Sequence, residues 1–194
     1  MRTAFLAALL LLAAPAERVH LTADEALALA FPGAKIERSR AFLTPEERQR
    51  AAALAGSEIE GGLVIPYTAR DAAGKLLGTA YFDVHRVRTL RETILIAIGP
   101  DERIRRIELL SFGEPPEYTP PPKWYGEFVG RKLDDDLRLG RGIRGISGAT
   151  LTARATTDAV RQVLAVHRVL TARPPGGAGG RGGGGAPAPA GGRR

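Results

Sequence analysis

The stretch Ile146-Ser147-Gly148-Ala149-Thr150-Leu151-Thr152-Ala153 stands directly before the longest helical pattern of the chain. A turn of small residues leading into a helix can bind an anion, because the first helical amides lack partners within the helix and the dipole favours negative charge. The glycine and alanine leave the backbone accessible to a ligand, and Thr150 adds a hydroxyl. Taken alone, the spacing favours a simpler interpretation, in which Ser147 or Thr150 caps the helix.

Within this stretch, Ser-Gly-Ala-Thr-Leu-Thr resembles the flavinylation motif of the FMN-binding domain family. That family includes the C subunit of the sodium-pumping NADH:quinone oxidoreductase and the G subunit of the Rnf complex. In the family, the threonine that ends Ser-Gly-Ala-Thr carries FMN through a phosphoester bond, and a separate flavin transferase attaches it from FAD. The resemblance implies covalent FMN at Thr150, with Ser147, Gly148, Ala149 and Thr152 beside the phosphate.

Arg144 is the clearest departure from the family pattern, which usually has an aspartate three residues before the serine. A guanidinium pairs with a phosphate through two parallel hydrogen bonds. We therefore expect Arg144 to interact with the flavin phosphate or ring. The alternative is that it only faces solvent.

A proline-rich loop at 113–118, followed by a tryptophan, lies where family members have a Glu-Thr-Pro-Gly loop. Glu114 and Pro116 match that loop, whereas its threonine and glycine are replaced. In relatives the loop borders the flavin ring, so the resemblance places Glu114 and Trp124 at the cofactor. Prolines stiffen a loop and tryptophan offers a flat apolar face, which agrees with this role. An ordinary loop with a core tryptophan remains an equal alternative for Trp124.

The composition limits the classes of function. The chain has 194 residues and no cysteine, which excludes disulfides, thiolate metal sites and a lipoprotein cysteine. The net charge of +7 falls to +2 once the arginines of the two terminal segments are set aside, so nucleic-acid binding has weak electrostatic support. Those arginines are Arg2, Arg173, Arg181, Arg193 and Arg194.

No pattern for metal binding or hydrolysis stands out. The carboxylates at 134–136 are adjacent in sequence and lack calcium-loop spacing, so we interpret them as a helix start or a solvated face. The histidines at 20, 85 and 167 are far apart and form no zinc motif, and we expect His85 to follow a strand at the surface. Nucleophile-elbow and P-loop motifs are missing too. The sequence thus gives no support for hydrolase chemistry, and the family resemblance implies an electron carrier or redox subunit instead of a self-contained catalyst.

The two ends of the chain differ from its middle. Residues 1–16 resemble a secretory signal, with a basic start, a short apolar run and a small-residue cleavage site, so we expect the mature protein to begin near Glu17 and to lie in the periplasm. An uncleaved anchor is the alternative. From residue 171 the composition collapses to glycine, alanine, proline and arginine, and ten of the 24 glycines lie between 176 and 192. This composition predicts a disordered tail at 171–194.

The middle, 17–170, reads as one α+β domain built on an antiparallel sheet packed with helices. Two capping boxes predict short helices after Thr22 and Thr44, and a long amphipathic helix closes the domain. Hairpins without βαβ spacing argue for antiparallel pairing, which is also the plan of the FMN-binding domain family. The predicted strands lie at 63–65, 67–70, 76–84, 92–98 and 104–112.

Three hypotheses for function follow. The first, which we favour, is an extracytoplasmic electron carrier with FMN tethered at Thr150, matured by a flavin transferase and serving redox partners at the membrane or in the periplasm. The second is a module that binds a phosphorylated ligand or flavin noncovalently at the same turn. The third is a partner-binding domain without cofactor. Only the first gives a fluorescent flavin band on a denaturing gel.

Overall fold

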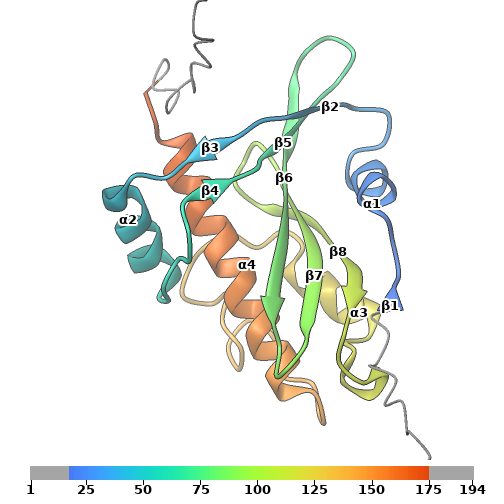
Figure 1. Ribbon diagram of the computed structural model, residues 1–194. Helices are drawn as coiled ribbons and strands as arrows, with labels where there is room; N and C mark the ends of the chain where they lie inside the picture. The colour runs from blue at the N-terminus through green and yellow to red at the C-terminus, as the bar shows by residue number, and fades with distance from the viewer. Residues whose placement is uncertain (1–17, 175–194) are drawn as a thin grey trace, which may run out of the picture.

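The computed structural model describes residues 18–174 and confirms the α+β class, with helices packed on both faces of an antiparallel sheet (Figure 1). The predicted signal peptide at 1–16 and most of the predicted tail lie outside the described residues. The main sheet has the order β1-β8-β7-β6-β5-β2, and β3 pairs with β4 in a separate two-stranded sheet. The strands are β1 (Arg18–Val19), β2 (Lys35–Arg38), β3 (Ala41–Phe42), β4 (Leu63–Val64), β5 (Tyr67–Arg70), β6 (Leu76–Arg86), β7 (Arg91–Ile98) and β8 (Ile104–Phe112).

The central strand β7 explains the layered arrangement. Its even-numbered residues, Ile94, Ile96 and Ile98, pack into the core formed with the last helix, while Leu95 and Ala97 face α1 on the other side. A strand covered on both faces becomes a continuous apolar run, which is what the sequence shows there. The helices are α1 (Ala23–Ala30), α2 (Pro45–Ala55), α3 (Pro122–Tyr125) and α4 (Thr150–Thr171), with 3-10 turns at Pro116–Tyr118 and Gly126–Phe128.

Both predicted capping boxes are confirmed. Thr22 exchanges hydrogen bonds with Glu25 at the start of α1, and Thr44 does so with Glu47 at the start of α2. Gly56 ends α2 in the left-handed conformation, with φ of 77°. The short strands β1, β2 and β3 were not predicted, because runs of two to four residues are too short to show a clear alternation.

The last helix, α4, is the longest element and lies across one face of the sheet beside α2 (Figure 1). It continues to Thr171, and Arg173 beyond it forms an ion pair with Glu47, so order extends past the expected start of the tail. None of the helices within 18–174 combines the length and apolarity that crossing a membrane requires. The start of α4 lies at the same end of the sheet as the β6–β7 turn.

Candidate functional site

The first turn of α4 is open. Thr150 is the first helical residue and is exposed, and the N-cap position is held by Ala149, whose side chain accepts no hydrogen bond. The capping role that the spacing favoured for Ser147 or Thr150 is therefore not what the structure shows. With no side chain capping α4 among the described residues, the first amides remain available to an anion.

The turn before the helix is fixed by its apolar residues and leaves its polar residues outside. Ala149 is buried and its amide donates to the Ile146 carbonyl at 3.0 Å, while Ser147 is exposed. Gly148 has φ of 80°, where a side chain would be strained, and the space around it is open. Backbone conformation, not crowding, thus requires glycine here, and the open space leaves room for a ligand.

Thr152 faces inward and has a partner in the protein. Its side chain is buried, and the hydroxyl donates to the carbonyl oxygen of Tyr118 at 3.0 Å. This bond joins the first turn of α4 to the proline-rich loop, so the structure brings together two of the segments predicted to form the site. The hydroxyl is thereby committed to positioning the helix, instead of being free to donate to a phosphate.

Glu114 lies in the same region but points at the β6–β7 turn. Its carboxylate accepts three backbone N–H bonds, from Arg88, Thr89 and Leu90, at 3.0, 2.7 and 2.8 Å. Burial by itself raises the pKa of this carboxyl, but the three backbone donors outweigh that effect and lower its pKa. The role that the structure supports for Glu114 is to hold this turn against the loop that borders α4.

Trp124 is a core residue. The residue is 4% exposed, and its ring makes edge-to-face contacts with Tyr125 and Phe128, at centroid distances of 5.4 and 5.1 Å. Its indole N–H donates to the carbonyl oxygen of Arg144 at 2.8 Å. Trp124 therefore anchors the backbone that leads into the 146–149 turn.

Arg144 is engaged by a carboxylate. Its guanidinium Nε and Nη2 each lie 2.8 Å from Glu127 Oε1, and its backbone N–H donates to the other oxygen of Glu127 at 2.9 Å. The Arg144 side chain is still 84% exposed. Neither expectation describes it fully: Arg144 faces solvent, yet its charge is paired within the protein.

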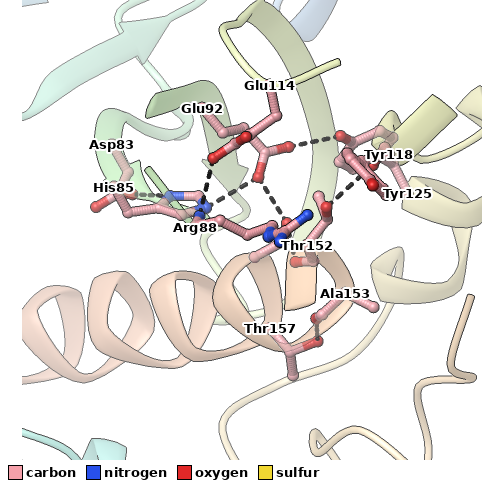
Figure 2. A network of polar contacts seen from close by, with 11 residues as sticks. Asp83, His85, Arg88, Glu92, Glu114, Tyr118, Tyr125, Thr152, Ala153 and Thr157 are labelled. Carbon is pink, nitrogen blue, oxygen red and sulfur yellow. Dashed lines mark hydrogen bonds and ion pairs between the residues drawn. The ribbon is translucent and has the colours of Figure 1, made fainter. Parts of the chain in front are cut away.

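A buried carboxylate that the sequence analysis missed holds the amino-terminal half of α4. Glu92 is 0% exposed and binds side chains from three other elements (Figure 2). Tyr125 of α3 donates to Oε1 at 2.7 Å, and Thr156 of α4 and His85 of β6 lie 2.7 and 2.9 Å from Oε2. The signal was present in the sequence, because Glu92 occupies the same face of β7 as three buried isoleucines.

His85 lies within β6, not after it as expected, and sits between two carboxylates. Its Nδ1 is 2.8 Å from Asp83 and its Nε2 is 2.9 Å from Glu92, so both ring nitrogens have acceptors. Burial lowers the pKa of the imidazole, but the hydrogen bonds and charges of Asp83 and Glu92 prevail and raise the pKa to about 9. His85 is accordingly a cation at neutral pH.

Two hollows in the surface of residues 18–174 lie away from the exposed turn at 147–150. One is bounded by β6, α4 and the segment 58–65, and the other by β8 and the segment 119–129; neither is lined by residues 147–150. Because Ser147 and Thr150 are exposed, a ligand at Thr150 would be held on the surface.

The acidic run 134–136 binds its own backbone, since the Asp134 carboxylate accepts hydrogen bonds from the amides of residues 136 and 137.

Part of the chain matches a known protein family. Residues 91–165, which run from β7 through most of α4, match the FMN-binding domain family. This match includes the turn at 146–149 and the open start of α4, and it confirms the resemblance seen in the sequence. The residues at that turn also fit FMN, because an exposed hydroxyl, an uncapped helix start and an uncrowded glycine can accommodate its phosphate.

A solved structure has the same fold. The crystal structure of NqrC from Shewanella oneidensis is similar at a TM-score of 0.51 and 18% sequence identity, over 70% of this chain and 84% of that chain. At this level of identity the similarity concerns the fold. No curated protein matches the sequence.

Proposed function

We propose that this protein is an extracytoplasmic electron carrier with FMN attached to Thr150 through a phosphoester. The observation that carries the proposal is that Thr150 is the exposed first residue of a long, uncapped helix inside the region that matches the FMN-binding domain family. The open helix start favours a negatively charged phosphate by roughly 0.3–1 kcal/mol. Bound FMN supplies the redox chemistry, and the protein supplies attachment and position.

The described residues divide this work between them. Thr150 offers the hydroxyl, and Gly148 keeps the turn in a conformation that leaves the backbone accessible. Thr152 fixes the helix start against the proline-rich loop, and Trp124 fixes the backbone that precedes the turn. Together they hold the attachment point on a rigid surface.

The open surface supports a covalent link. Noncovalent cofactors usually bind in clefts that bury most of their area, whereas Ser147, Gly148 and Thr150 are exposed. A tether raises the effective concentration of the cofactor to about the millimolar range, so even weak contacts keep it in place. Attachment by a flavin transferase and electron exchange with partners at the membrane or in the periplasm belong to the same proposal, with cleavage before Glu17.

The decisive experiment is to produce the full chain with and without a flavin transferase and to inspect it on a denaturing gel under ultraviolet light. We expect a fluorescent band only with the transferase, and none for Thr150→Ala. Thr150 is exposed, so this change should alter the free energy of unfolding by less than about 0.5 kcal/mol. Thr152→Ala should lower loading without abolishing it, and Thr152→Ser, which keeps the hydroxyl, should restore it.

Peptide mass spectrometry locates the link. Cleavage after Arg144 and Arg154 gives the peptide 145–154, and fragmentation should place the flavin on Thr150. Flavin on Ser147 or Thr152, or full loading of Thr150→Ala, would falsify the assignment. Flavin that is retained in the native protein but lost in denaturant would instead identify a noncovalent module.

A further inference from the structure

The β6–β7 turn holds a cation in a fixed place near the start of α4. The amide of Val87 donates to the Leu90 carbonyl at 3.0 Å, and the three following amides all donate to the buried carboxylate of Glu114. A turn tied by four such bonds has little conformational freedom. Arg88 within it therefore starts from a well-defined backbone position.

The Arg88 side chain is held by a ring and leaves its donors free. Its guanidinium lies 5.3 Å from the centroid of the Tyr118 ring, within the range of a cation–π contact. Among residues 18–174 the guanidinium has no carboxylate or hydrogen-bond partner, and the residue is exposed. Arg144 differs, because Glu127 already pairs its charge.

Tyr118 connects this cation to the proposed attachment point. Its ring makes the cation–π contact with Arg88. Its carbonyl oxygen accepts a hydrogen bond from the hydroxyl of Thr152, two residues after Thr150 (Figure 2). The cation and the first turn of α4 thus share one support. The N–H donors of this guanidinium are unused and its position is fixed. It is therefore suited to bind two oxygens of a phosphate at once.

We propose that Arg88 binds the phosphate of FMN at the start of α4. This inference rests on the proposed function and adds a residue to it, since Arg88 lies outside the stretch 91–165 that matches the family. Arg88 takes the role that the sequence analysis expected of Arg144. The hydroxyl of Thr150 and the guanidinium of Arg88 then approach the phosphate from different elements, α4 and the β6–β7 turn.

The test compares the affinity of the unloaded full chain for FMN and for riboflavin, which lacks the phosphate, by quenching of flavin fluorescence. The wild type should prefer FMN, and Arg88→Gln should reduce that preference about tenfold while leaving riboflavin affinity unchanged. Arg88→Lys, which keeps the charge but not the fork, should be intermediate. The matched control is Arg86→Gln, an exposed arginine at the end of β6.

Loading kinetics give a second readout. With a flavin transferase and FAD, Arg88→Gln should slow the initial rate about tenfold, while its melting temperature stays close to that of the wild type because only a surface cation–π contact is lost. Equal affinity for FMN and riboflavin, or no FMN binding at all, overturns the inference even if Thr150 is flavinylated. A shift of the midpoint potential with unchanged FMN preference overturns it too, because Arg88 would then contact the ring. Failure of the proposed function is recognised separately, by the missing flavin band of the wild type in denaturant.

Discussion

The two ends of α4 differ in how their backbone groups are capped. At the carboxyl end, the hydroxyl of Thr171 and the amide of Ala172 both bond to helix carbonyls, and Arg173 bridges to Glu47 and to the carbonyl of Phe42. At the amino end no described side chain caps the helix, and Thr150 is exposed. A capping side chain is worth about 1 kcal/mol, so its omission at the end that carries the motif favours a ligand there.

The open end is nonetheless firmly held within its first two turns. Glu92 binds Thr156 and Thr152 binds Tyr118, so the amino-terminal half is fixed from the sheet and from the loop. Farther along, the buried guanidinium of Arg161 donates to four carbonyls, two of them at the end of α2. The comparison shows that the amino end of α4 combines an uncapped, exposed first turn with a rigid support, as the proposed attachment point requires.

The largest effect should come from removing the support of the open end. Glu92→Ala leaves Tyr125, Thr156 and a His85 cation without their shared acceptor, and we expect a loss of about 3–5 kcal/mol in the free energy of unfolding. Urea denaturation measures this. Flavin loading of the folded fraction should also fall, because the amino-terminal half of α4 loses its bond to the sheet. If Glu92→Ala unfolds like the wild type, the support that we assign to Glu92 is wrong.

The two ends should respond to opposite extremes of pH. The pKa of His85 is raised to about 9. Its contribution to the free energy of unfolding is therefore full below about pH 6.5 and is lost as the pH rises through 9. Near the other end, hydrogen bonds from Arg173 lower the pKa of Glu47 to about 2, so that contribution is present above about 4.5 and is lost as pH falls through 2.

Melting temperatures recorded across this pH range test the contrast. His85→Gln should flatten the alkaline fall between about pH 6.5 and 9 and leave the acid limb as it is, whereas Arg173→Gln should alter only the acid limb. The change should be smaller than that of Glu92→Ala, since each substitution leaves the other contacts of its cluster in place. Identical alkaline limbs in the wild type and His85→Gln would contradict the charge that we assign to His85.

The smallest effect should come from shortening the chain beyond the capped, carboxyl end of α4. Deleting 174–194 retains Arg173 and its bonds to Glu47, so the free energy of unfolding should change by less than about 0.5 kcal/mol. Flavin content should be unaltered. Calorimetry and the denaturing gel check both points, and a large fall in melting temperature would show that the tail contributes to the carboxyl end after all.

The sequence by itself determined the class of fold, the capped helices and the place of the motif. These follow from local rules: capping boxes, turn residues and apolar periodicity depend on neighbours in the chain, and Thr22, Thr44 and Gly56 have the local roles that these rules predict. The family motif likewise identified the start of α4 before its geometry was known.

Only the tertiary structure decided which side chains are free at that start. Arg144 and Thr152 are near the motif in sequence, but Glu127 and Tyr118, which are distant in sequence, occupy them. Glu92 became a support because β7 lies beneath α4. Arg88 lies against the Tyr118 ring, and its turn is held by Glu114. Partners this far apart along the chain meet only when the sheet and helix pack, so no local pattern could reveal which charges would be paired and which would stay available.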